Sequence, residues 1–184
     1  MNSDELEALI RSRRSSLLLD AHKQVDNDLL QRVIDTAQFA PNHRRTWPLR
    51  VAAVTGASRS VLGDTIADAM AMFGDDEAKV TKARTKYLRS PVVLVVASAQ
   101  GSSENETEEN KYAVAAGIQN MLLGATAMGL ASFWSSCPKG CNDDVARHCG
   151  FASGTHVTAM IYIGWPTKDL PAIERPAPAI TYFN

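Results

Sequence analysis

The 184-residue chain has few cysteines, few aromatic residues and almost no net charge. Its three cysteines, Cys137, Cys141 and Cys149, are too few and too clustered for the disulfide framework of a small secreted domain. Lys and Arg number 19 against 20 Asp and Glu, so the formal charge of -1 gives no general attraction to nucleic acid or anionic lipid. Because the amino end is acidic and no signal-peptide pattern follows, we expect a cytoplasmic protein with reduced thiols.

Familiar catalytic motifs are missing as well. The sequence has no P-loop, Rossmann glycine fingerprint, nucleophile elbow or metalloprotease helix. Four neighbouring residues carry the side chains of zinc ligands: Cys137, Cys141, His148 and Cys149. Their spacing lacks the pairs of ordinary zinc sites, so we expect buried thiols and no metal. The apolar stretch 112–130 is long enough for a membrane span, but its polar Gln119 and Asn120 favour a buried helix.

The order of predicted elements indicates one α+β domain over residues 1–184, with helices packed around a sheet. Hydrophobic spacing and capping residues predict helices over 4–13, from 26 or 27 up to Pro41, and over 61–72, 77–87, 112–130 and 142–149, the last capped by Asn142. Strands are predicted over 49–55, 92–96, 131–135 and 156–164. The run 92–96 is continuously apolar and reads as a strand buried on both faces. We expect 100–110 to be a solvated loop and the tail from Pro166 to be extended.

Two features predict an obligate homodimer. The segment 112–130 is apolar on every face of its predicted helix, which one small domain can hardly cover. The tail ends in Tyr182 and Phe183 and could add a strand to a partner's sheet edge. A second copy of the chain would cover both surfaces.

A cationic cluster, Arg11-Ser12-Arg13-Arg14-Ser15-Ser16, stands where the first predicted helix ends. Guanidinium groups hold phosphate oxygens bidentately, and serine hydroxyls and loop amides can complete such a cradle. The alternative is a helix whose last turn carries solvated cations that suit its dipole. The spacing alone leaves both interpretations open.

Two further segments could contact a ligand. The loop 40–48 combines an amide, an imidazole (His43), arginines and an indole (Trp47) between prolines, and such loops often contact ligands. The alternative is a surface turn whose indole is tucked into the core. The run Trp134-Ser135-Ser136-Cys137-Pro138 could present amides and hydroxyls to a ligand or simply end a strand.

Taken together in their order, these segments resemble the FMN-dependent nitroreductase family, and within it the small YdjA-type NAD(P)H nitroreductases. The matching elements are Ser12-Arg13-Arg14-Ser15, Ala40-Pro41-Asn42-His43, Ala115-Ala116-Gly117-Ile118-Gln119-Asn120-Met121-Leu122-Leu123, Gly129-Leu130-Ala131-Ser132-Phe133-Trp134, Tyr162-Ile163-Gly164-Trp165-Pro166 and Thr181-Tyr182-Phe183. The resemblance spans nearly the whole chain. It implies a mostly antiparallel central sheet flanked by helices, and an intertwined homodimer with exchange of a C-terminal strand and two FMN sites at the subunit interface.

The resemblance also implies roles for individual residues. Arg13 and Ser15 would hold the FMN phosphate, with Arg14 beside them. Trp134, Ser135 and Ser136 would line the flavin on the same subunit, while His43 and Trp47 would reach it from the other one. Arg175 could add a phosphate contact, as a basic residue near the tail does in some larger members.

Two positions depart from the family pattern. Leu17 stands where many relatives carry a basic residue near the flavin pyrimidine, so a charge that favours reduced flavin is missing. Trp47 stands where relatives often have a polar side chain, which suggests stacking on the ring rather than hydrogen bonding.

The resemblance implies an oxidoreductase in which NAD(P)H reduces FMN and a nitroaromatic or quinone then takes the electrons by ping-pong kinetics, without catalytic residues beyond the cofactor. The same fold could instead act on enones or halogenated compounds, or bind flavin without catalysis. A nucleic-acid binder is a further alternative, which would use five arginines: Arg11, Arg13, Arg14, Arg44 and Arg45. The net charge and the lack of a DNA-binding motif speak against it.

Overall fold

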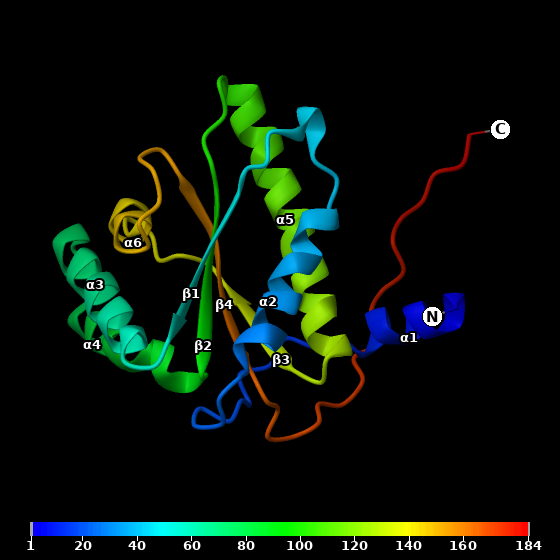
Figure 1. Ribbon diagram of the computed structural model, residues 1–184, viewed down its shortest axis with the longest axis horizontal. Coiled ribbons are helices and arrows are strands. Elements are labelled where there is room, and N and C mark those ends of the chain that lie inside the picture. Colours follow the sequence, from blue (N-terminus) through cyan, green and yellow to red (C-terminus); the bar gives the residue numbers. More distant parts are fainter. Residues whose placement is uncertain (1, 184) are drawn as a thin grey trace.

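A computed structural model describes residues 2–183 and centres on one antiparallel sheet. Its strands are β1 (Leu49–Thr55), β2 (Val92–Ser98), β3 (Ala131–Ser135) and β4 (His156–Gly164), in the order β1-β2-β4-β3 (Figure 1). All neighbouring strands are antiparallel. The strands predicted at 49–55, 131–135 and 156–164 are confirmed with their bounds, and β2 is two residues longer than predicted. The α+β class is therefore confirmed.

Helices cover both faces of this sheet (Figure 1). They are α1 (Ser3–Ser12), α2 (Asn27–Asp35), α3 (Ser58–Phe73), α4 (Glu77–Lys86), α5 (Glu104–Ala127) and α6 (Asn142–His148), with short 3₁₀ turns over Thr36–Phe39, His43–Arg45 and Tyr87–Arg89. Helices α2 and α5 pack on one face, and α3, α4 and α6 lie on the other.

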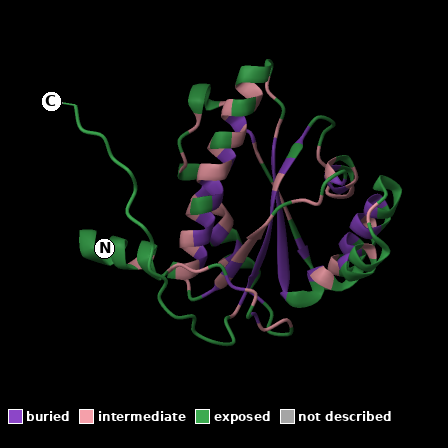
Figure 2. Cartoon of the chain, turned by 180° about the vertical axis from the view of Figure 1, so that it is seen from behind, coloured by how far each residue is buried: buried purple, intermediate pink, exposed green. Residues whose placement is uncertain are grey.

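The core is organised by β2, all seven of whose residues are buried. Val93 and Val95 point into the cluster under α3, whereas Leu94 and Val96 point into the cluster under α5. Figure 2 shows the resulting pattern, with buried residues in the sheet and along the inner sides of the helices. The prediction of a strand buried on both faces is confirmed.

Two local predictions are wrong. Residues 100–110 are not a solvated loop, because α5 begins at Glu104, where the Ser103 hydroxyl caps it by accepting the Glu106 N–H at 3.2 Å. Asn142 is the first residue of α6 rather than its cap. Its side chain instead ties the helix to β4, because its amide donates to the Thr155 carbonyl at 3.1 Å and its oxygen accepts the Val157 N–H at 2.8 Å.

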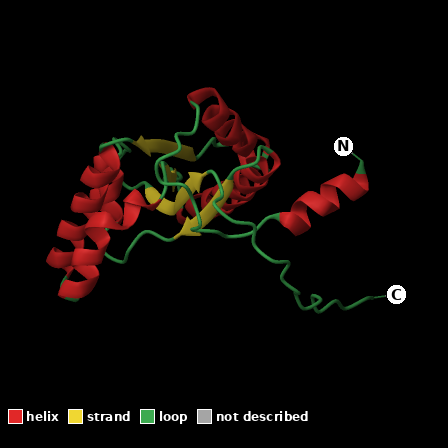
Figure 3. Ribbon diagram, turned by 90° about the horizontal axis from the view of Figure 1, so that it is seen from below, coloured by secondary structure: helices red, strands yellow, loops and turns green. Residues whose placement is uncertain are grey.

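Helix α1 and the C-terminal tail project from the body of the molecule (Figures 1 and 3). Helix α1 contains no buried residue, and its apolar Leu6 and Ile10 are 42% and 45% exposed. The tail runs without helix or strand to Phe183 and is exposed, as predicted for an extended segment. In the part of the chain that the structure describes, no helix is long and apolar enough to cross a membrane. Neither projecting segment buries an apolar side chain in the core of its own protomer.

Candidate functional site

The chain leaves α1 and runs directly beside the edge strand β3. Arg13 leaves the helical conformation with φ -58° and ψ 127°, and its N–H still bonds the Leu9 carbonyl at 3.2 Å. Ser15 then pairs with Ser132 as a parallel bridge, and the Ser16 N–H donates to the Ser132 carbonyl at 2.9 Å. The cationic cluster is therefore fixed against the sheet rather than free on a frayed helix end.

Three guanidinium groups, those of Arg13, Arg14 and Arg175, gather at this point without an ion-pair partner among the described residues. Burial, followed by the nearby charges of Arg175 and then Arg14, lowers the pKa of the Arg13 guanidinium below its ordinary value. Within residues 2–183, no carboxylate forms an ion pair with any of these three arginines. Like charges that repel one another and are partly desolvated are stabilised by an anion. The cluster therefore has the electrostatics of an anion site.

The two adjacent arginines have different surroundings. The Arg14 side chain donates to the Pro171 carbonyl at 3.2 Å, to its neighbour's carbonyl at 3.0 Å and to the Arg11 carbonyl. It therefore holds the start of the tail against the end of α1. No hydrogen bond of the Arg13 guanidinium occurs among the described residues, so its donors are free for a ligand.

The end of β3 lies further along the strand that Ser15 meets. Trp134 and Ser135 are half-buried and Ser136 is exposed. Leu17, the position where many relatives carry a basic residue, packs against the core cluster that contains Tyr162. Its side chain supplies no positive charge there. Six of the eight predicted site residues thus follow one edge of the sheet, from the arginines beside the start of β3 to Ser136 after its end: Arg13, Arg14, Ser15, Trp134, Ser135 and Ser136. Arg175, which the sequence made only a secondary candidate, lies on the tail near the arginines at the end of α1.

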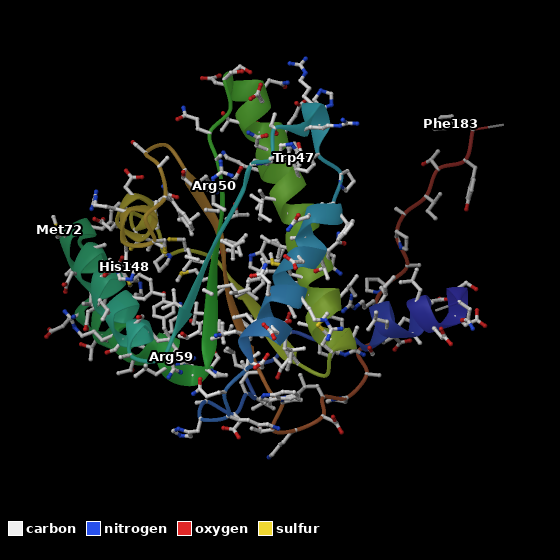
Figure 4. The ribbon with its side chains drawn as sticks, viewed as in Figure 1. Trp47, Arg50, Arg59, Met72, His148 and Phe183 are labelled. Carbon is white, nitrogen blue, oxygen red and sulfur yellow. The ribbon has the colours of Figure 1, made fainter. Side chains whose placement is uncertain are left out.

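His43 and Trp47 lie elsewhere, in the loop at the opposite end of α5 from α1 (Figures 1 and 4). Trp47 is 62% exposed and not tucked into the core. His43 Nε2 stands 3.9 Å from a carboxylate oxygen of Glu109 on α5. Within one protomer the structure therefore does not bring these two residues to the other site residues.

The loop is strained and borders a pocket. Arg44, Arg45 and Trp47 have φ of 55°, 55° and 49°. Left-handed conformations cost non-glycine residues of order 1–3 kcal/mol each and concentrate at functional sites. A pocket of about 320 Å³ lies between this loop, the start of β1 and α5, and its lining includes Asn42, Trp47, Pro48, Arg50 and Val114.

Among the described residues, neither a zinc site nor a single surface for nucleic acid is assembled. In residues 2–183 no three His, Cys, Asp or Glu side chains are grouped so that they could hold a metal ion. Arg44 and Arg45 lie on the loop at the far end of α5 from α1, and Arg11 is paired with Glu7. The five arginines of the nucleic-acid hypothesis therefore do not form one surface.

Sequence reasoning missed one buried polar residue, Asn110, because it lies in the polar stretch that was predicted to be a solvated loop. It sits on α5 beneath the strained loop, where it bonds Thr46. An asparagine seven residues after a serine cap, among acidic residues, carries no signal of burial in the sequence.

The antiparallel sheet covered by helices on both faces, with unpaired arginines at the end of α1 and the exposed Trp47 at the other end of α5, defines an α+β protein. The family model of the nitroreductase family matches residues 10–165, and the chain belongs to that family. It is 27% identical to the Bacillus subtilis protein named "Putative NAD(P)H nitroreductase YfhC", over 97% of this chain and 93% of that protein.

Solved structures show the same fold. A nitroreductase-like family protein from Bacillus cereus superposes with a TM-score of 0.81 at 24% identity, covering 96% of this chain and 94% of that one. A nitroreductase from Bacteroides fragilis, solved with bound FMN, superposes with a TM-score of 0.78 at 21% identity and covers both chains completely.

Proposed function

We propose that the protein is an FMN-dependent NAD(P)H oxidoreductase that passes electrons to nitroaromatic or quinone-like acceptors by a ping-pong mechanism. The observation that carries this proposal is the pair of guanidinium ions without ion-pair partners, Arg13 and Arg175, near the end of α1, which suits the phosphate of FMN. Membership of the nitroreductase family and the name of the Bacillus subtilis relative support it. When bound, FMN would supply the redox chemistry, accepting a hydride from the nicotinamide and releasing electrons to the acceptor.

The residues at the sheet edge would bind and orient the cofactor. Arg13 would grip the phosphate with its free guanidinium donors, and Ser15, fixed by its bridge to Ser132, would add a hydroxyl. Arg14 would act beside them by holding the tail, which carries Arg175, close to the phosphate. The half-buried Trp134 and Ser135, with Ser136, would line the flavin ring where β3 ends.

A second copy of the chain would complete the site. Trp47 lies at the other end of α5 from α1 (Figure 4), and His43 belongs to the same loop, so both would reach the flavin of the partner. The exposed apolar side of α1 and the exposed aromatic residues Tyr112 on α5 and Tyr182 on the tail support a homodimer, because pairing would remove them from water. Exchange of the tail between subunits would add a strand to the partner's sheet.

The three free cysteines suit a reducing compartment, so we place the protein in the cytoplasm.

Cofactor analysis tests the proposal. The purified protein should be yellow, release FMN on denaturation and sediment as a dimer. Rapid mixing with NADH and with NADPH should bleach the flavin absorbance, and an added quinone should restore it. Parallel lines in a double-reciprocal plot would support the ping-pong sequence. A colourless protein that takes up no FMN would refute the proposal, whereas bound FMN that neither nucleotide reduces would leave a noncatalytic flavin protein.

A further inference from the structure

The loop that carries Trp47 is held by a short network of polar side chains. The Asn42 side-chain oxygen accepts the Thr46 N–H at 3.1 Å. The Thr46 hydroxyl lies 3.0 Å from that same oxygen and 2.6 Å from the side-chain oxygen of Asn110 on α5. The closer contact joins the loop to the helix, and it fixes the residue immediately before Trp47.

The residue after Trp47 is held through the same asparagine. The Asn110 amide donates to the Ala99 carbonyl at 3.3 Å, and the Ala99 N–H donates to the Pro48 carbonyl at 2.8 Å. Asn110 is only 4% exposed, and its oxygen and its amide group are both used in these contacts. One buried side chain therefore contacts the anchors on both sides of Trp47.

Trp47 itself has one direct anchor, an exposed one: its carbonyl accepts from the Arg50 guanidinium at 2.9 Å. Its side chain is 62% exposed, and its backbone adopts the left-handed φ of 49°, which an L residue keeps only when its surroundings enforce it. Since the indole is not packed in the core, its direction depends on the Trp47 backbone. The buried contacts that fix this backbone are those at Thr46 and Pro48.

We propose that Asn110 is a positioning residue for the flavin site: it acts through Thr46 and Pro48 to hold Trp47 in the strained conformation that presents the indole to the cofactor bound by the other subunit. This inference rests on the proposed function, in which Trp47 contacts flavin. Because stacking depends on the plane of the ring, a loop that samples several conformations would lose affinity even with the indole intact.

A double-mutant cycle on dimeric protein loaded with FMN tests this role. Thr46→Val removes the hydroxyl at nearly constant volume and should raise the FMN dissociation constant about tenfold, the effect of losing one buried hydrogen bond. Thr46→Ser keeps the hydroxyl and should stay within twofold of wild type. Asn110→Ala should weaken binding at least as much as Thr46→Val. In a Trp47→Ala background, Thr46→Val should add no further loss, since the hydroxyl acts through the indole.

Amide hydrogen exchange provides a readout without the cofactor. In the FMN-free protein, Thr46→Val should speed exchange over residues 42–48 and leave β2 unchanged. Thr65→Val is the matched control, because it removes a half-buried hydroxyl on α3, on the other face of the sheet, where it contacts the Val61 carbonyl at 3.0 Å and a ring nitrogen of His148 at 3.1 Å. It should alter neither loop exchange nor FMN affinity.

The outcomes separate this inference from the proposed function. Wild-type protein that binds no FMN would refute the function itself. Wild-type protein that binds FMN, with Thr46→Val and Asn110→Ala binding it equally well, would overturn the positioning role. Losses from Thr46→Val and Trp47→Ala that simply add would overturn it as well, because the hydroxyl would then act independently of the indole.

Discussion

Replacing Arg13 by alanine should separate cofactor binding from folding. In most structural ion pairs the loss of one partner weakens the fold, because the other charge is left unpaired. Arg13 is different, because its charged neighbours within the described residues are Arg175 and Arg14, which repel it. Its removal therefore relieves repulsion in the free protein and removes a phosphate partner in the loaded protein.

The two effects have opposite signs. A hydrogen bond to a charged group contributes about 1.5–3 kcal/mol, so the FMN dissociation constant of Arg13→Ala should rise roughly 10- to 150-fold. The free energy of unfolding of the FMN-free protein should stay the same or rise by a few tenths of a kcal/mol, of the order expected for a partly exposed charge interaction.

Fluorescence titration of FMN and urea unfolding of the FMN-free protein measure the two quantities. Arg11→Ala is the matched control, since Arg11 lies on α1 and pairs with the exposed Glu7, and it should leave FMN affinity within twofold of wild type. Arg13→Lys should recover part of the affinity, because an ammonium keeps the charge without the bidentate fork. An Arg13→Ala protein that binds FMN as tightly as wild type would show that the phosphate lies elsewhere.

Three further predictions address the core, alkaline pH and the tail. Leu94→Ala, at a fully buried position of β2, should lower the free energy of unfolding by about 2–5 kcal/mol in urea denaturation. Burial raises the pKa of the Cys137 thiol to about 12 and that of Cys149 to about 11 from 9.0, so above about pH 9 the unfolded chain ionises first. Between pH 8 and pH 10 the free energy of unfolding should fall by about 1.3 kcal/mol per thiol, and Cys137→Ala should flatten that slope; an unchanged slope would contradict the burial of this thiol. Deleting residues 168–184 should give a monomer by sedimentation and weaken FMN binding, since the tail carries Arg175 and its exposed aromatic residues; a stable dimer with full affinity would argue against strand exchange.

The strands were predictable because their signals are local. The runs 49–55, 92–96 and 156–164 are rich in β-branched residues and bounded by glycine, proline or polar residues, and each is a strand in the structure. The prediction of a loop at 100–110 was wrong because this stretch carries no local hydrophobic signal of a helix. Its first helical turns are acidic and solvent-facing, so the hydrophobic period that marks α5 begins only farther along the chain.

The sequence by itself determined the order of the elements, the doubly buried strand β2 and the presence of cations after α1, because these depend on residue type and short spacing. Only the tertiary structure decided which cation is free. It turned Arg14 to the Pro171 carbonyl of the tail, left the Arg13 guanidinium without a hydrogen-bond partner and brought Arg175 near it. It also buried Asn110 beneath the Trp47 loop. These contacts join residues far apart in the chain, and hydrogen bonds between such residues depend on how the chain is packed, which no local pattern in the sequence encodes.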